Sequence, residues 1–391
     1  MLKSRRLRGV LTLGLTALTI AVGSVCVGSE ANAESDVSDS ASRTFVYTIA
    51  NPDGPNAIAA YERNPETGEL ILLGAYPTGG RGSGRLIDSQ GPLVASADGT
   101  LLYAINPGSE DISIMATKAD GSLEPVGAPV PTRGVAPASL ALGSNYLFVA
   151  NKGDAANPPN YSSFRVESDG TLTRIKRRII LSIGDNPTHV LLNREGTMLI
   201  GVRLGSGGID SFFVSSRGKL FQSATLNNQR GPFAAAFNPQ AAEQMLVADA
   251  RLPGAVSYGV SSNGLLSAGG AVSNAPERAA CWIVVHPDGL RAWVSNTGTN
   301  SLSLYTIGAG GALSLAGTHS TAVYGRTPFE IALDSNSGFL YQLNIGGGRP
   351  NIHALRLTGS TTDAGLVDIG AMDLPAGSSP IGLVVVARPI L

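Results

Sequence analysis

The sequence has little charge and almost no cysteine. Only 15% of its 391 residues are charged, and 28 basic residues face 29 acidic ones. This near balance argues against nucleic acid as the main partner. Of the two cysteines, Cys26 lies in an N-terminal segment that is expected to be removed, so the mature chain is expected to hold Cys281 alone and no internal disulfide. Cys281 lies in an apolar run, which favours a buried small hydrophobe over a reactive thiol.

The short motifs of common catalytic and metal sites are also missing. The sequence contains no Gly-x-Ser-x-Gly, His-Glu-x-x-His or Cys-x-x-Cys pattern, and its 4 histidines lie far apart. The run at 79–84 is rich in glycine, but it lacks the Gly-Lys-Ser/Thr end of a phosphate loop, and no helix signal follows it. We therefore predict no metal and no cofactor, and we expect 79–84 to be a long loop between repeats.

The N-terminal residues have the features of a processed export signal. A basic start at 3–8 precedes an apolar run at 10–22 that is too short to span a bilayer comfortably, and the small residues at 31–33 fit a cleavage site. We interpret 1–33 as a secretory signal peptide and the polar stretch 34–43 as a flexible linker. The mature protein is then expected to be secreted or extracytoplasmic, with no membrane contact after the signal is removed.

Turn residues and short hydrophobic runs are abundant. The chain contains 49 glycines and 23 prolines, and 43% of its residues are hydrophobic. Between 281 and 315, four runs rich in β-branched and aromatic residues are separated by turns, and none has the 3.6-residue period of a helix. A Gly-x-Leu turn, imperfect in its last copy, recurs in steps of 46 to 54 residues at Gly68, Gly121, Gly170, Gly218, Gly264, Gly311 and Gly365. This period is that of a four-stranded propeller blade.

Two further markers also occur seven times. Runs that end in a turn residue fit a second strand at 45–51, 101–106, 146–151, 198–203, 245–249, 291–296 and 339–344. The residues that open each innermost strand are Pro92, Pro137, Pro187, Pro232, Ala280, Pro328 and Pro380. We predict one domain at 44–391, an all-β seven-bladed β-propeller with four antiparallel strands per blade. Because the first blade lacks its opening strand and 381–387 is left over, the C-terminal strand is expected to join the first blade and close the ring.

Arginines recur near the strand openings. Three of them stand two residues before an opening residue, and a fourth ends a second strand; they are Arg230, Arg278, Arg326 and Arg203. In the predicted connectivity these four side chains surround one mouth of the central channel, where they could bind a carboxylate or phosphate. The alternative is that they pair with acids or carbonyls between blades. His189 also falls near the channel, so His189 and Arg203 are the candidate catalytic residues, with a structural role as the alternative for His189.

The repeat resembles a known family. Gly231-Pro232, 286–289 (His-Pro-Asp-Gly), 294–296 (Val-Ser-Asn) and the Gly-x-Leu turns are similar to the blade signature of lactonase-type seven-bladed propellers, which include 6-phosphogluconolactonase and carboxymuconate-cyclising enzymes. The resemblance covers about residues 44–389. Members of that family place His, Arg and Glu side chains around the channel. The matching positions in this chain hold Thr188, Phe233, Ala234, Ala250 and the Asn-Thr-Gly-Thr stretch 296–299.

Two functions from different classes remain open. The first is a secreted lactonase-like propeller, divergent at the family's usual catalytic positions, that binds a small anionic or sugar-derived ligand, or a protein partner, at the channel mouth. The second is an active lactone hydrolase or muconate-lactone cyclase of that family with a rebuilt site. Because histidine and glutamate bases are hard to replace with Thr and Ala, the sequence favours the first.

Overall fold

A computed structural model describes residues 42–227, 230–264, 266–334, 338–359 and 362–389. The expected signal peptide at 1–33 lies outside these residues, as does most of the expected linker. Ser42 and Arg43, which the sequence placed in that linker, are instead the first residues of a β-strand. In the described part of the chain, no helix is both long and apolar enough to cross a membrane.

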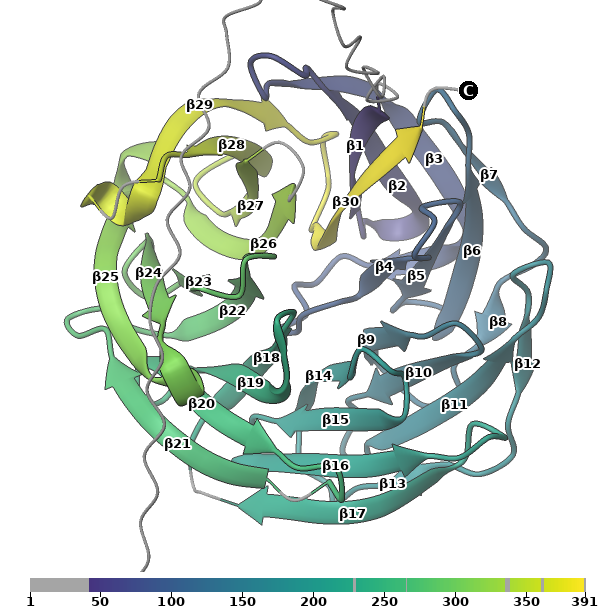
Figure 1. The fold of residues 1–391 in the computed structure, drawn as a ribbon. Helices are drawn as coiled ribbons and strands as arrows, with labels where there is room; N and C mark the ends of the chain where they lie inside the picture. Colours follow the sequence, from purple (N-terminus) through teal and green to yellow (C-terminus); the bar gives the residue numbers. More distant parts are fainter. Residues whose placement is uncertain (1–41, 228–229, 265, 335–337, 360–361, 390–391) are drawn as a thin grey trace, which may run out of the picture. The chain divides into compact units, whose positions relative to one another are not determined.

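The described chain folds into seven antiparallel sheets arranged in a ring (Figure 1). Blade 1 contains, from the innermost strand outward, β30 (Ile381–Pro389), β1 (Ser42–Ile49), β2 (Asp53–Arg63) and β3 (Leu70–Ser83). In the same direction, blade 2 contains β4 (Leu93–Ala95), β5 (Leu101–Asn106), β6 (Asp111–Thr117) and β7 (Leu123–Pro125). Blade 3 contains β9 (Pro137–Leu142), β10 (Tyr146–Asn151), β11 (Asn160–Val166) and β12 (Leu172–Arg174). The short strands β8 (Val130–Pro131) and β13 (Ile179–Ile180) pair with β6 and β11 and complete these two blades.

The other four blades have four strands each. Blade 4 contains β14 (Pro187–Leu192), β15 (Met198–Arg203), β16 (Gly208–Val214) and β17 (Leu220–Asn227). Blade 5 contains β18 (Pro232–Asn238), β19 (Ala241–Asp249), β20 (Gly254–Val260) and β21 (Leu266–Ser273). Blade 6 contains β22 (Ala280–Val285), β23 (Arg291–Asn296), β24 (Ser301–Ile307) and β25 (Leu313–Ser320). Blade 7 contains β26 (Thr327–Asp334), β27 (Phe339–Ile345), β28 (Asn351–Leu357) and β29 (Leu366–Asp373).

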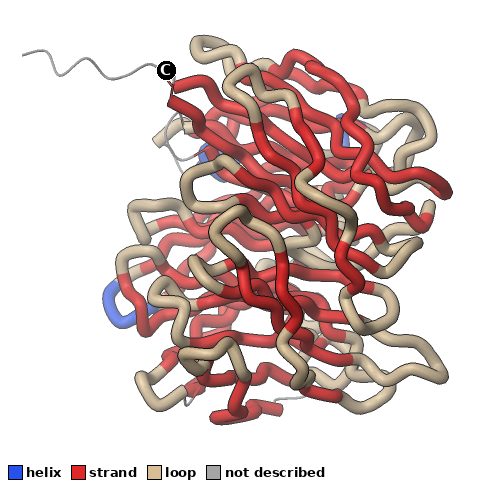
Figure 2. Tube along the Cα trace, turned by 90° about the vertical axis from the view of Figure 1, so that its right-hand side faces the viewer, coloured by secondary structure: helices blue, strands red, loops and turns tan. Residues whose placement is uncertain are grey.

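Strands dominate the side view in Figure 2, and the described helices are three short 3-10 turns, η1 (Ala309–Gly311), η2 (Ala322–Tyr324) and η3 (Thr362–Gly365). The seven sheets confirm the predicted seven blades.

The expected loop at 79–84 is wrong, because β3 continues to Ser83 and its end pairs with Asp53–Pro55. A glycine-rich run can form a strand where a close neighbour leaves no room for side chains, and here a Cβ on Gly82 would collide with the backbone of Pro52.

Successive blades are joined by a repeated contact to the Gly-x-Leu turns. An aromatic side chain of a second strand donates a hydrogen bond to a carbonyl in the equivalent turn of the next blade, through Tyr47 to Gly121, Tyr103 to Gly170, Trp293 to Ala364, and Tyr341 to Gly68 across the closure. Gly121 has a φ of 83°, and a Cβ at this position would collide with the Phe45 ring. At this repeat position both the positive φ and the close packing against the neighbouring blade require glycine.

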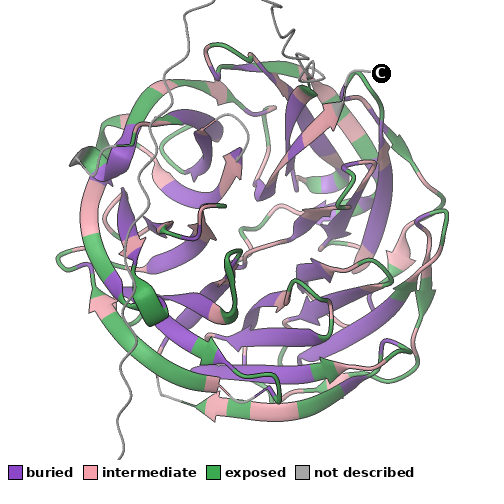
Figure 3. Ribbon diagram, in the orientation of Figure 1, coloured by how far each residue is buried: buried purple, intermediate pink, exposed green. Residues whose placement is uncertain are grey.

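The C-terminal strand closes the ring as predicted. β30 pairs with β1 in antiparallel register, with Phe45 opposite Val386 and Thr48 opposite Leu383. At the seam between blades 7 and 1, the buried Arg63 Nε lies 3.0 Å from Asp334 Oδ2. Figure 3 shows buried residues gathered in the inner strands, whereas the outermost strands are largely exposed or intermediate. The core therefore lies between the blades, around the channel.

Candidate functional site

The centre of the ring is filled by the chain itself. The connection from β3 to β4 runs into the middle of the ring in Figure 1, and we call its residues Ser89–Gly91 the axial segment. The Gln90 side chain makes two hydrogen bonds to the backbone of Ile283, each of 3.0 Å. The Trp282 indole donates to the Ser89 carbonyl at 2.8 Å. These contacts tie the connection between blades 1 and 2 to blade 6, on another side of the ring.

Blades 3, 4 and 7 also hold the axial segment. Ser89 Oγ donates to the Ala138 carbonyl at 2.8 Å, and Gln90 N donates to the Thr188 carbonyl at 3.1 Å. Gly91 N donates to Glu330 Oε1 at 3.1 Å. The channel expected from the sequence is therefore divided into two ends. One end carries the loops between blades and the ends of the second strands, and we call it the mouth; the other end carries the turns between first and second strands.

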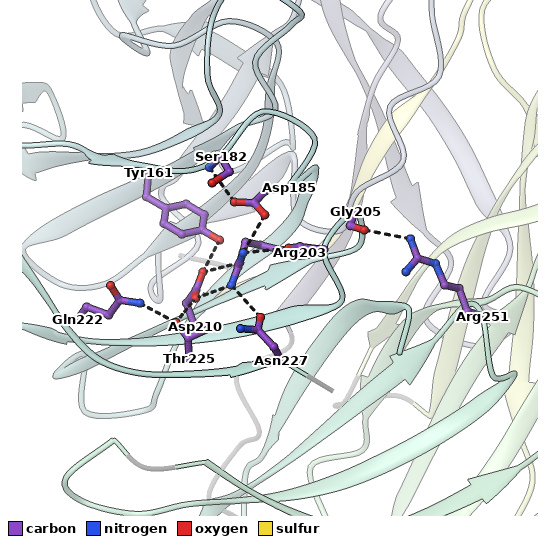
Figure 4. A network of polar contacts seen from close by, with 11 residues as sticks. Tyr161, Ser182, Asp185, Arg203, Gly205, Asp210, Gln222, Thr225, Asn227 and Arg251 are labelled. Carbon is purple, nitrogen blue, oxygen red and sulfur yellow. Dashed lines mark hydrogen bonds and ion pairs between the residues drawn. The ribbon is translucent and has the colours of Figure 1, made fainter. Parts of the chain in front are cut away.

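Arg203 is the centre of a buried polar network at the mouth (Figure 4). Its Nη1 donates to Asp185 Oδ1 at 2.8 Å, and its Nε lies 2.9 Å from Asp210 Oδ2. Arg203 is 8% exposed, and Tyr161 OH donates to Asp210 Oδ2 at 3.5 Å. Two carboxylates therefore already balance the Arg203 charge. The alternative left open by the sequence was pairing with acids or carbonyls between blades, and Arg203 does pair with acids: Asp210 belongs to its own blade, and Asp185 lies in the connection from blade 3 to blade 4.

The pKa values of the two acids that contact Arg203 are shifted in opposite directions. Burial raises the pKa of Asp210 above its usual range despite the neighbouring Arg203 guanidinium. The pKa of Asp185 is lowered, because hydrogen bonds from Ser206 and the Ser182 backbone, with the Arg203 charge, outweigh its burial. Asp185 stands two residues before Pro187, the repeat position at which blades 5, 6 and 7 carry Arg230, Arg278 and Arg326. Because this repeat position holds an acid in blade 4, where blades 5, 6 and 7 have an arginine, Arg203 finds an ion-pair partner there.

The other three predicted arginines do not share this network. Arg278 is exposed, and its backbone N–H donates to Thr299 Oγ1 at 3.2 Å. Arg326 is half-buried, with Nη2 3.9 Å from Asp373 Oδ1. Arg230 is half-buried, and its carbonyl accepts a hydrogen bond from Arg251. These arginines come from the starts of three successive blades, at the same end of the ring.

Lys152 is a mouth residue that sequence reasoning missed. Its Nζ donates to the Asp88 carbonyl at 2.7 Å and to Asn186 Oδ1 at 2.9 Å. Burial lowers the pKa of Lys152 to about 8, against an opposing contribution from the Asp88 carboxylate. No carboxylate lies within ion-pair distance of Nζ in the described ranges. A signal was present in the sequence, because the residue after each second-strand end is uncharged in every other blade.

His189 and Glu330 lie at the other end of the channel. They occupy the same repeat position, two residues after Pro187 and Pro328. Ala235 N donates to His189 Nδ1 at 3.2 Å, and burial lowers the pKa of His189 to about 3, so this imidazole is neutral. Burial raises the pKa of Glu330 to about 8, against contributions from nearby backbone N–H groups. A histidine held neutral in this way is a weak general base, which supports the structural alternative for His189.

Cys281 and the histidines give no sign of metal or thiol chemistry. Burial raises the pKa of Cys281 to about 12, and its Sγ lies 3.8 Å from Thr297 Oγ1. The thiol is thus the buried small group that the sequence indicated. Among the described residues, no group of three or more His, Cys, Asp and Glu side chains is arranged to hold a metal ion.

Comparison with solved structures identifies the architecture. The sequence matches no protein-family model. No curated protein sequence matches it. A candidate 6-phosphogluconolactonase from Bacteroides uniformis superposes with a TM-score of 0.72 at 18% identity, covering 88% of this chain and 99% of that chain. The periplasmic gluconolactonase PpgL of Pseudomonas aeruginosa gives a TM-score of 0.71 at 18% identity, covering 89% and 99%. This chain has the fold of the lactonase-type propellers.

In this propeller, two of the positions matched to the family's channel residues, Thr188 and Phe233, make packing and backbone contacts. Thr188 Oγ1 donates to the Phe233 carbonyl at 2.6 Å. The Phe233 ring lies 4.8 Å from the Trp282 ring, which in turn lies 4.0 Å from the Phe329 ring. Of these three side chains, Trp282 also contacts the axial segment, through its indole hydrogen bond to the Ser89 carbonyl. At identities below one fifth, the likeness to these structures establishes the fold, and function has to be argued from the site.

Proposed function

We propose that this protein is an extracytoplasmic lactonase-type propeller that binds a small anionic, sugar-derived ligand at the mouth and does not turn it over by the family's usual chemistry. The observation that carries the proposal is Lys152. Its ammonium group is half-buried at the mouth and is held by two neutral oxygens. A half-buried cation that no carboxylate contacts gains from an anion that supplies the missing charge.

The surrounding charges favour the same ligand class. Arg278 exposes a guanidinium at the mouth, and Arg251, which is also exposed, donates to the Gly205 carbonyl at 3.2 Å. Arginine forks match the planar oxygens of a carboxylate or phosphate. Arg230 and Arg326 are retained from the sequence prediction as flanking contacts. We give Arg203 a supporting role, because its ion pairs with Asp185 and Asp210 hold the mouth end of blade 4 in place.

An extracytoplasmic location is supported by the sequence and by one structural relative. Residues 1–33 have the order of charge, apolar run and small residues found in export signals. One of the solved structures with this fold is named as a periplasmic protein. Expression with residues 1–33 present, followed by fractionation and N-terminal sequencing of the product, would test this part. A mature N-terminus at Glu34 is expected, and retention of residues 1–33 on a cytoplasmic product would contradict it.

Ligand binding is tested by calorimetry and thermal shift with gluconate, 6-phosphogluconate and inorganic phosphate. We expect at least one of these anions to bind saturably to the wild-type protein. The variants Lys152→Met and Arg278→Gln should weaken that binding about tenfold or more, since each removes a charged hydrogen bond worth roughly 1.5–3 kcal/mol. Arg217→Gln, which alters an exposed turn far from the mouth, is the matched control. Absence of binding by all three anions, or equal binding by Lys152→Met, would refute the site.

Lactone hydrolysis by a rebuilt site is the second candidate, because solved structures with this fold carry gluconolactonase names. Its candidate residues are His189 and Arg203. Hydrolysis of glucono-1,5-lactone and muconolactone above the spontaneous rate, lost in His189→Ala but kept in Arg217→Gln, would establish this activity. The buried, neutral state of His189 leads us to expect no such turnover.

A further inference from the structure

A second cavity lies at the end of the channel opposite the mouth. It encloses about 1200 Å³ and extends from Gln90 and Gly91 of the axial segment to the turns between first and second strands of blades 2, 3 and 4. Its inner lining includes His189 and Glu330, together with apolar side chains such as Val284. This cavity is distinct from the proposed anion site, because Lys152, Arg251 and Arg278 are not among the residues that line it.

Glu330 has an unused hydrogen-bonding oxygen at the inner end of this cavity. The residue is only 3% exposed. Its Oε1 accepts from Gly91 N at 3.1 Å. Oε2 makes no hydrogen bond of good geometry in the part of the chain that the structure describes, although the backbone N–H groups of Gly382 and Leu383 lie near the carboxyl. A buried polar atom without a partner costs free energy comparable to a lost hydrogen bond. Because protein atoms cover Oε2 in the free protein, a ligand group would recover that free energy once the carboxyl turns toward the cavity.

His189, which also lines the cavity, supplies a second polar atom, its Nε2. Because His189 Nδ1 accepts the Ala235 N–H, the ring proton of the neutral imidazole lies on Nε2. Gly91 lies between the two groups: its N–H binds Glu330, and a Cβ built on it would stand 3.6 Å from His189 Nε2. The absence of a side chain at Gly91 therefore leaves room next to both.

We propose that this cavity binds a small uncharged polar molecule, of the size and hydroxyl content of a monosaccharide, with its oxygens held by Glu330 and His189. At neutral pH burial keeps the carboxyl protonated and the imidazole neutral. Neither group then offers a full charge to an anion. The apolar side chains of Leu140, Val284 and Leu383 also line the cavity and suit the C–H faces of a sugar ring.

The test uses the full mature protein with D-glucose and D-xylose as neutral probes and D-gluconate as the charged counterpart. Calorimetry and ligand-observed NMR should show saturable binding of a neutral probe and at least tenfold weaker binding of gluconate at this cavity. Glu330→Met, which removes the hydrogen-bonding group, should weaken the neutral probe about tenfold, and Glu330→Gln, which keeps a donor, should stay within about threefold. Val284→Phe, which fills the cavity and leaves both polar groups in place, should abolish binding.

The proposed anion site provides the control. Lys152→Met should leave the neutral probe's affinity unchanged, because Lys152 does not line this cavity. The proposal is overturned if neither neutral probe binds, if Glu330→Met binds as tightly as the wild type, or if Lys152→Met removes the binding. Each variant's melting curve is recorded first, so that loss of binding is read only from folded protein.

Discussion

Replacing Glu330 with glutamine should change the pH dependence of folding. Glutamine has the shape of glutamic acid and keeps the carbonyl oxygen that accepts the Gly91 N–H. The substitution therefore removes only the ability to ionise. In the wild type, burial holds the folded-state pKa of Glu330 at about 8, whereas the ordinary pKa of an exposed glutamate is 4.5.

The wild type should lose stability as the pH rises through this interval. Below pH 4.5 the carboxyl is protonated in both states, so the stability linked to Glu330 is fully present. As the pH rises, the unfolded chain ionises first, and stability is lost progressively until the folded carboxyl ionises near pH 8. The slope is about 1.4 kcal/mol per pH unit between the two pKa values and flattens near each of them, so the wild type should lose about 3.5 kcal/mol between pH 5 and pH 8 that Glu330→Gln retains.

Urea unfolding of both proteins at pH 5, 6, 7 and 8 measures this difference. The contribution of His189 cancels, because its environment is the same in the two proteins. Glu66→Gln, at an exposed turn, is the matched control and should follow the wild type at every pH. A stability difference between wild type and Glu330→Gln that stays constant from pH 5 to pH 8 would show that Glu330 is not buried as a neutral acid, and the argument for the second cavity would fail with it.

Three further predictions concern the ring. Deletion of 380–391 removes β30 and should give a protein that aggregates or lacks a cooperative melting transition; a soluble, cooperatively melting truncation would contradict the closure. Arg63→Met should lower the free energy of unfolding by about 3–5 kcal/mol, because it removes the buried partner of Asp334, whereas Arg165→Met at an exposed ion pair should cost less than about 1 kcal/mol by urea unfolding. Cys281 should react with a thiol reagent only at the rate of unfolding, and rapid labelling of the folded protein would show that it is accessible.

The seven-fold repeat could be predicted because its markers have local physical causes. A turn that needs a positive φ selects glycine, and Gly121 illustrates this with its φ of 83° and its contact with Phe45. The closure by 381–387 followed from counting strands, since one blade lacked a strand and one strand had no blade. Such features depend on residues close in sequence, or on a count, so the sequence alone carries them.

The site could be predicted only in part, because its contacts join residues far apart in the chain. Gln90 contacts Ile283, 193 residues away, and Gly91 contacts Glu330, 239 residues away. Gln90 and Gly91 belong to a connection between blades, and none of the repeat markers includes them. Arg203 was found by its unusual position at the end of a second strand. Its partner Asp185 stood at a repeat position already known to carry arginine, but the pairing depends on the direction of both side chains.

The way the ring closes brings the two ends of the described chain together. Ser42, at the start of β1, stands opposite Pro389, at the end of β30. Antiparallel neighbours in this arrangement can be joined by a hairpin of about two to five residues, so a short engineered linker could turn blade 1 into an uninterrupted meander like the other six. New termini could then be cut at an exposed turn such as 261–263, which would make this protein a favourable scaffold for circular permutation.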